Sequence, residues 1–201
     1  QGLLMIDMQR AFDNSSWGER NNPQLEVNSQ KCLIFLEKGY WPVLHVQHVY
    51  TNTQSRFHES QGQDFKDGFQ PYPSEPVFQK IVNSAFIRTN LESYLRDKRI
   101  DKLVIAGFNL PHCVSTTTRM AANLGFKTSL ISDATASFAT NLDGHLIDPE
   151  VLHTINLVSL HDEFAQVMTI EEFMGMIMKS SMPSVLTQKV RQIIYPKDLV
   201  L

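Results

Sequence analysis

Short runs of apolar residues recur along the chain, each about four residues long. They lie at Leu3–Ile6, Val43–Val46, Leu103–Ala106 and Ser129–Ile131. Strands buried on both faces of a parallel sheet have this pattern, because neither face leaves room for the alternating polar residues of a half-exposed strand. The runs therefore predict strands of one mainly parallel sheet.

Helical patterns with start and stop signals separate these runs. The predicted helices begin at capping residues, at first-turn prolines or just after a tight turn, and they span Pro23 to Gly39, Asn90 to Lys98, Val114 to Leu124, Asp148 to Leu160 and Phe173 to Met178. Thr89 with Glu92, and Thr169 with Glu172, have the spacing of a capping box. Because strands and helices alternate, we expect right-handed crossovers and an α/β fold, a three-layer α/β/α sandwich.

Two segments do not follow this alternation. About thirty mostly polar residues with three prolines lie between Tyr50 and Lys80, and we weigh a lid over a site against a surface loop. Residues 183–201 have only a weak helical period. We expect one domain over residues 1–182 and a C-terminal tail over 183–201 that docks on this domain or on a neighbouring subunit.

Composition narrows the class of protein. The chain has 201 residues, of which 42% are hydrophobic and 19% are charged, so it is long enough to bury a core without a disulfide or a structural metal. A net charge of -3 without a basic stripe argues against a nucleic-acid partner. No apolar run approaches the roughly 18 residues of a membrane span, and the opening residues lack the basic region of a signal peptide, so we expect a trimmed first strand there. Two cysteines suit a reducing cytosol, which makes a cytoplasmic location our expectation.

Three residues carry candidate chemistry because of their place in the predicted sheet. Reactive groups of open parallel sheets gather beyond the carboxyl ends of the strands. Asp7 directly follows the first apolar run, and Cys113 stands at the start of a predicted helix, where the helix dipole lowers a thiol pKa from about 8.5 toward neutrality. Lys80 closes the polar segment. Each has an ordinary interpretation as a turn residue, a buried thiol or a surface charge, and Cys32, in the middle of a helix, is expected to be a buried apolar filler.

A thiol, a carboxylate that takes its proton and a cation that holds both charges form a complete set for nucleophilic acyl transfer. Four separated motifs make the chain, from about Gly2 to Met168, resemble the isochorismatase-like cysteine hydrolases, which include nicotinamidases, carbamoylsarcosine and ureidoacrylate amidohydrolases and isochorismatases. These motifs are Leu4–Gln9 with Phe12, Lys80 with Ser84–Phe86 and Thr89–Leu91, Gly107–Val114 with Thr117 and Ala121, and Asp133–Ala134.

The resemblance implies a Rossmann-type sheet topology and a catalytic triad of Asp7, Lys80 and Cys113. It also implies a cis peptide bond before Asn109, and an oxyanion hole formed by the backbone N–H groups of Asn109 and Cys113. Pro111 departs from the polar residue that is commoner in this turn and cannot itself donate an N–H. Proteins of this kind are commonly dimers or tetramers, so we expect a homo-oligomer.

A catalytic metal is not expected. Nicotinamidases of this family add a metal site built from an aspartate and histidines after the second strand, whereas this chain reads Leu44-His45-Val46-Gln47-His48-Val49. If this stretch is a strand, His45 and His48 point to opposite faces and cannot bind one ion together. We therefore predict neither a metal nor a cofactor, and nicotinamide becomes a less favoured substrate.

The substrate is indicated only in outline. Phe12, Trp17, Phe86 and Phe138 are candidates for apolar walls of a cleft, Gln9 and Asn83 for polar groups that orient a ligand, and His112 for a donor to substrate or a contact with a neighbouring subunit. The predicted function is hydrolysis of a small amide, ureide or carbamoyl compound at its C–N bond through a thioester on Cys113. Two alternatives remain, namely hydrolysis of the vinyl ether of isochorismate, which needs proton donation more than a thiol, and a catalytically silent binding or scaffold protein.

Overall fold

The structure, a computed structural model, describes residues 1–38 and 41–181, so the predicted tail at 183–201 lies outside the described residues. The chain divides into one unit over residues 1–170 and a second that begins at residue 171. The described part of the second unit lies in helix α5 (Ile170–Ser181).

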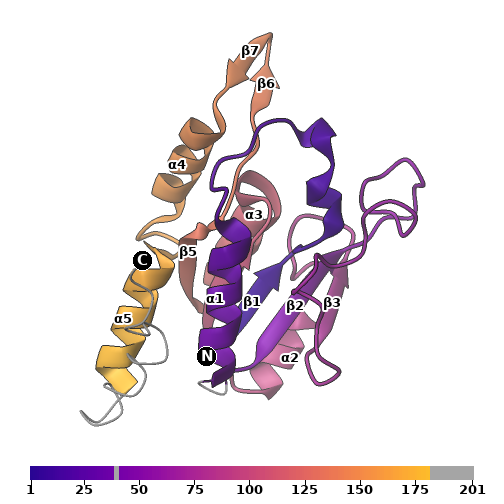
Figure 1. Cartoon of the computed structure of the whole chain (residues 1–201). Helices are drawn as coiled ribbons and strands as arrows, with labels where there is room; N and C mark the ends of the chain where they lie inside the picture. The colour runs from indigo at the N-terminus through magenta and orange to yellow at the C-terminus, as the bar shows by residue number, and fades with distance from the viewer. Residues whose placement is uncertain (39–40, 182–201) are drawn as a thin grey trace, which may run out of the picture. The chain divides into compact units, whose positions relative to one another are not determined.

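Six parallel strands form the central sheet, in the order β3-β2-β1-β4-β5-β8 (Figure 1). The four predicted runs lie in β1 (Gly2–Ile6), β2 (Val43–His48), β4 (Lys102–Gly107) and β5 (Lys127–Thr135). The two edge strands, β3 (Val77–Lys80) and β8 (Gln166–Met168), were not predicted. The side chains of β3 alternate between exposed and buried, so that strand lacks the continuous apolar run of the central strands.

Helices cover both faces of this sheet, which confirms the predicted three-layer α/β/α sandwich (Figure 1). Helix α1 (Leu25–Lys38) contacts β1, β2, β4 and β5 on one face. On the other face, residues of α2 (Leu91–Asp97), α3 (Ser115–Asn123) and α4 (Pro149–Leu160) join one apolar core with every second residue of the strands, such as Leu4 and Ile6. Leu3 and Met5, which alternate with them, are equally buried, so β1 is covered on both sides.

The helix ends agree with the predicted signals in part. Asp148 caps α4 as expected, since its side chain accepts hydrogen bonds from the amides of Glu150 and Val151. At α2 the predicted capping box of Thr89 and Glu92 is wrong. The Thr89 hydroxyl does accept the N–H of Leu91, but Glu92 pairs with Arg96 one turn later and does not return to the helix start.

The long segment between β2 and β3 is held along the beginning of the chain. It lies against two short 3-10 turns, η1 (Arg10–Asp13) and η2 (Ser15–Trp17). The amide of Ala11 donates to the carbonyl of Gly62 at 2.8 Å, and the amide of Lys66 donates to the carbonyl of Met8 at 2.8 Å. These bonds place the segment beside the residues that follow β1, which is where Asp7 stands.

A small antiparallel hairpin, β6 (Thr140–Leu142) and β7 (His145–Ile147), extends beyond the sheet (Figure 1). Its turn is Asp143–Gly144, with φ angles of 51° and 83°, which is the sequence and conformation favoured in two-residue hairpins. The dipeptide was therefore a signal that the sequence analysis did not use. Within the described part of the chain, no helix has the length and apolar character needed to cross a membrane.

Candidate active site

The candidate site lies at the point where the order of the strands reverses. From β1 the chain proceeds through β2 to β3 on one side, and then through β4 and β5 to β8 on the other. The connections that follow the neighbouring strands β1 and β4 therefore run in opposite directions, which leaves a crevice at the carboxyl ends of these two strands. Asp7 follows β1 and Cys113 follows β4, so both stand at this crevice.

Asp7 owes its orientation to an unusual backbone. Its φ of 51° lies in the left-handed region, which Asp tolerates better than most residues. Its amide donates to the carbonyl of Val46 at 3.0 Å, and its carbonyl accepts the amide of Gln9 at 2.7 Å. Strand β1 therefore ends at Asp7 in a sharp turn, and the carboxylate is fully buried.

The turn that carries Cys113 depends on a glycine. Gly107 has a φ of 121°, and a Cβ atom at this position would lie 2.0 Å from the carbonyl oxygen of Ile6. Only glycine permits so close an approach of β4 to the end of β1. The peptide bond between Phe108 and Asn109 is cis, as the resemblance implied. A short π-helical turn, Leu110–Val114, then leads into α3 and presents Cys113.

The ammonium group of Lys80 lies at the centre of the site. Its Nζ is 2.7 Å from Oδ2 of Asp7 and 3.2 Å from Sγ of Cys113. Lys80 ends β3, two strands away from β1, and its side chain reaches the site fully buried. The fold therefore brings together the three residues singled out in the sequence, because Asp7 and Cys113 both lie within hydrogen-bond distance of the Lys80 ammonium.

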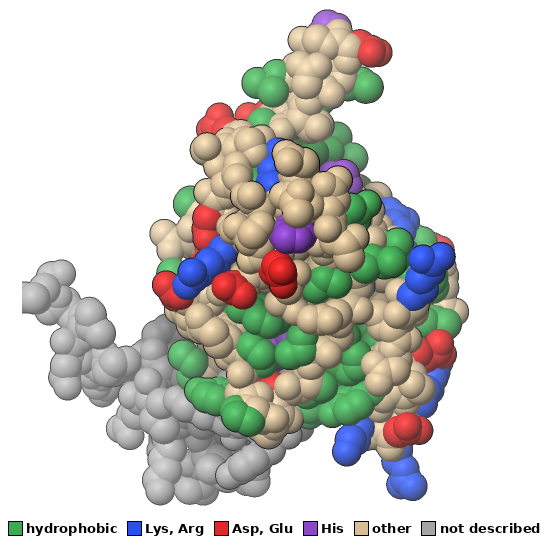
Figure 2. All heavy atoms as spheres, turned by 90° about the vertical axis from the view of Figure 1, so that its right-hand side faces the viewer, with side chains coloured by type: hydrophobic (Ala, Val, Ile, Leu, Met, Phe, Trp, Pro, Cys, Tyr) green, Lys and Arg blue, Asp and Glu red, His purple; other side chains and the backbone are tan. Residues whose placement is uncertain are grey.

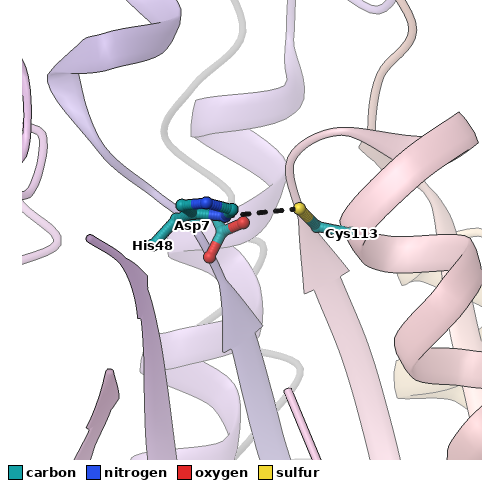
Figure 3. A group of neighbouring side chains, drawn as sticks. All are labelled: Asp7, His48 and Cys113. Carbon is teal, nitrogen blue, oxygen red and sulfur yellow. Dashed lines mark hydrogen bonds between the residues drawn. The ribbon is translucent and has the colours of Figure 1, made fainter. Parts of the chain in front are cut away.

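His48 is a site residue that the sequence analysis missed. It ends β2 and pairs in register with Lys80, and its Nδ1 is 2.9 Å from Nζ of Lys80 and 3.9 Å from Sγ of Cys113. Figure 3 shows Asp7, His48 and Cys113 pointing toward one another, the first two from the ends of β1 and β2 and Cys113 from the turn that leads into α3. Its position in the sequence could have identified it, since a polar residue at the carboxyl end of a central strand lies at the same edge of the sheet as Asp7.

The same three side chains form a group that could hold a metal ion, because one ligand atom of each lies within 4.8 Å of the others. The spacing of the sequence did not reveal this group. The Lys80 ammonium, however, is already within hydrogen-bond distance of all three atoms and supplies the positive charge there. His45 faces the opposite side of the sheet, where its Nε2 lies 3.0 Å from Glu75, so the two histidines do not share an ion site.

Burial controls the protonation of the site. Burial, followed by the charge of Asp7, raises the pKa of the Cys113 thiol, and Lys80 opposes this only in part. The shift is opposite to the expected lowering by the helix N-terminus, because desolvation and a neighbouring carboxylate both disfavour the thiolate. Burial and the charge of Lys80 lower the pKa of His48 to about 4, which leaves this imidazole neutral at pH 7.

Three of the four predicted wall residues lie together. Phe12 stacks on Trp17 with ring centroids 5.1 Å apart, and Trp17 stacks on Phe138 at 5.2 Å. Phe57, from the long segment, contacts Phe12 at 5.4 Å and the ring of His48 at 4.7 Å. This aromatic cluster therefore extends to the site through Phe57, a residue that the sequence analysis did not single out.

The remaining predicted residues are dispersed. Phe86 lies in the apolar core under α2 and α3, the same core that contains Cys113, and its ring stacks on Phe126 with centroids 5.8 Å apart. Asn83 is exposed, with its Oδ1 3.8 Å from Sγ of Cys113, and His112 is exposed on the turn. Gln9 is fully buried and binds the backbone of His48 with both ends of its carboxamide, so its contacts are structural.

Comparison with known proteins gives the family. The model of the isochorismatase domain matches residues 1–172. The chain is 44% identical over 183 residues to the uncharacterized isochorismatase family protein YrdC of Bacillus subtilis, a match that covers 90% of this chain and 97% of YrdC. It is 28% identical over 115 residues to the ureidoacrylate amidohydrolase RutB of Agrobacterium fabrum, covering 57% of this chain and 46% of RutB.

Among solved structures, a putative hydrolase of the isochorismatase family from Chromobacterium violaceum superposes with a TM-score of 0.83 at 35% sequence identity. The match covers 86% of this chain and 91% of that one. The crevice at the β1/β4 switch point, the buried residues around it and these matches lead to the same conclusion. The chain belongs to the isochorismatase family of hydrolases.

Proposed function

We propose that the protein hydrolyses a C–N bond of a small amide, ureide or carbamoyl compound through a thioester on Cys113. The observation that carries this proposal is the buried ammonium of Lys80, which contacts both the Asp7 carboxylate and the Cys113 sulfur. This arrangement joins a nucleophile to a base and a cation, which is the set that acyl transfer requires. The similarity to a ureidoacrylate amidohydrolase supports the same bond type.

The first step is a proton transfer within the site. The thiol is neutral at rest, because burial and Asp7 raise its pKa. Of the two carboxylate oxygens of Asp7, Oδ2 accepts a hydrogen bond from Lys80, whereas Oδ1 is buried and has no hydrogen-bond partner among the described residues. Oδ1 therefore takes the thiol proton as the sulfur attacks the carbonyl carbon, and Lys80 stabilises the developing thiolate.

Two backbone amides are proposed to stabilise the oxygen of the attacked carbonyl. In the turn before α3, the amide of Leu110 donates to Ala136 and the amides of His112 and Val114 donate to the carbonyl of Asn109. Pro111 has no N–H. The proposed oxyanion donors are the amides of Asn109 and Cys113, which the family resemblance implies, and a donor of this kind typically lowers the barrier by about 3 kcal/mol.

Collapse of the tetrahedral intermediate breaks the C–N bond, and the protonated carboxyl of Asp7 gives its proton to the departing nitrogen. Water then attacks the thioester and loses a proton to Asp7. The second collapse returns that proton to the sulfur and releases the carboxylic acid or carbamate. Each proton that Asp7 takes is given back within the cycle, so the protein needs no further acid or base.

The non-reacting part of the substrate is assigned to the pocket beside the site. A cavity of about 560 Å³ is lined by residues that directly follow His48 and Lys80 and by the long segment: Val49, Tyr50, Thr51, His58, Glu59, Gln63 and Ile81. Figure 2 shows the side of the molecule that carries β3 and this segment, where hydrophobic side chains lie beside histidine and acidic ones. Such a mixed lining suits a small, partly apolar compound with hydrogen-bonding groups.

A panel of primary amides, ureides and N-carbamoyl compounds tests the proposal, with ammonia release as the measurement. We expect release by the unmodified protein and by Cys32→Ala, which removes a thiol buried in α1, and none by Cys113→Ala. Pyruvate release from isochorismate would instead favour vinyl ether hydrolysis. If Cys113→Ala releases ammonia as fast as the unmodified protein, the proposed nucleophile is wrong.

A further inference from the structure

We infer that His48 is a positioning residue, whose neutral Nδ1 fixes the orientation of the Lys80 ammonium so that one of its N–H groups points at the Cys113 sulfur. The inference rests on the proposed function, because it concerns the cation that this function requires. It gives a role to the residue that the spacing of the sequence left only as a rejected metal ligand.

The donors and acceptors of this group match in number. A lysine ammonium has three N–H groups and no acceptor. Three acceptor atoms surround Nζ of Lys80, namely Oδ2 of Asp7 at 2.7 Å, Nδ1 of His48 at 2.9 Å and Sγ of Cys113 at 3.2 Å. The side chain of Lys80 is fully buried, so bulk water does not take the place of an acceptor that is lost. Without His48, one N–H of a buried cation would be unpaired.

The contact also defines the tautomer of His48. Because an ammonium can only donate, Nδ1 must carry the lone pair and Nε2 must carry the proton. A protonated ring would place a second donor and a second positive charge against Lys80. Burial and Lys80 both disfavour that state, and the charge of Asp7, which favours it, is the weaker influence.

Neighbouring groups hold His48 in this orientation. The Gln9 carboxamide accepts a hydrogen bond from the amide N–H of His48 at 2.8 Å and donates one to its carbonyl at 2.9 Å, so both peptide groups that flank His48 are fixed. The ring lies against Phe57, with centroids 4.7 Å apart. A ring that is fixed at both its backbone and its face does not follow a moving ammonium, so the ammonium takes its orientation from the ring.

Two substitutions separate the acceptor from the ring. In His48→Asn the carboxamide oxygen stands one bond from Cγ, as Nδ1 does, so an acceptor is kept while the ring is lost. In His48→Phe the ring and its contact with Phe57 are kept while the acceptor is lost. The experiment measures the rate of Cys113 alkylation by iodoacetamide from pH 5 to 10, read by mass spectrometry on the full chain, with the buried Cys32 as a control that stays unmodified while the chain is folded.

We expect His48→Phe to alkylate at least about tenfold more slowly than the unmodified protein at pH 7, and its pH profile to shift, because loss of one charge-assisted hydrogen bond has an effect of this size. His48→Asn should stay within about threefold and keep the profile. Equal rates and equal profiles for both variants and the unmodified protein would overturn the inference. A larger loss in His48→Asn than in His48→Phe would also do so, because the ring and not the acceptor would then be what matters.

A second measurement does not depend on the reactivity of Cys113. Two-bond ¹⁵N–¹H correlations of the His48 ring at pH 7 report which nitrogen carries the proton. We expect the Nε2–H tautomer in the unmodified protein, and loss of this preference in Lys80→Met. An Nδ1–H tautomer would refute the inference even if Cys113 is active, whereas an inert Cys113 with the expected tautomer would refute the proposed function and leave the contact in place.

Discussion

Replacing Lys80 by Met tests the central contact of the site. Methionine keeps an unbranched side chain of similar length in the same buried position, but it has no charge and no donor. The substitution leaves the carboxylate of Asp7 fully buried and without its cation, since Lys80 is the residue that pairs with it. Such a carboxylate either remains charged at a high cost or takes up a proton.

The size of the effect follows from that choice. Removing one partner of a buried ion pair typically destabilises a protein by about 3–5 kcal/mol. At pH 7, protonating a carboxylate whose ordinary pKa is about 3.9 costs about 4 kcal/mol, since each pH unit above the pKa adds about 1.4 kcal/mol. We therefore expect a loss of roughly 3–4 kcal/mol in the free energy of unfolding at pH 7. The loss should shrink by about 1.4 kcal/mol per unit as the pH falls to 5, because the native state of the variant then binds a proton that the unfolded state does not.

Urea unfolding at pH 7 and pH 5 measures this effect in four proteins, which are the unmodified chain, Lys80→Met, Asp7→Asn and the double variant. The double variant lacks both charges and therefore contains no unpaired one. Its loss of stability should be smaller than the sum of the losses in the two single variants. Turnover should fall by at least about a hundredfold in Lys80→Met, because a protonated Asp7 cannot take the thiol proton.

The reasoning is refuted if Lys80→Met unfolds at pH 7 with the free energy of the unmodified protein, or if its loss is the same at both pH values. Strict additivity in the double variant would show that the two side chains do not interact. Alkylation of Cys113 in Lys80→Met at the unmodified rate would show that the cation has no part in activating the thiol.

Two further predictions concern the backbone and acid stability. Gly107→Ala should destabilise the protein by about 3 kcal/mol or more, because the new Cβ would meet the carbonyl oxygen of Ile6. The control Gly125→Ala, at a position with a positive φ of 86° but open space around it, should cost about 1 kcal/mol. Thermal unfolding compares the two variants, and equal losses would contradict the steric argument. Between pH 6.5 and pH 4 the unfolded state binds a proton at His48 that the folded state does not, so the free energy of unfolding should decrease as the pH falls through this range, by up to about 2 kcal/mol after allowance for solvent screening. His48→Asn should have a flatter profile over this range, and an unchanged slope in that variant would assign the acid sensitivity to other groups.

The buried strands and the order of elements were readable from the sequence, because both depend on local pattern. A strand covered on both faces must be continuously apolar, and the runs at Leu3–Ile6 and Leu103–Ala106 appear as strands in the structure. Edge strands have no such requirement. Lys80 therefore looked like the end of a polar loop, although it ends β3.

The sequence by itself determined the fold class, the family and the three residues that carry the candidate chemistry, since the motifs around them are local. Tertiary structure alone decided that a fourth residue, His48, joins them and that Phe86 stacks on Phe126 in the core and not on the other predicted wall residues. It also decided the resting state of the sulfur, because the desolvation that raises the pKa of Cys113 depends on what covers the thiol. Burial and proximity arise from the packing of segments that are distant along the chain, and no local pattern records them.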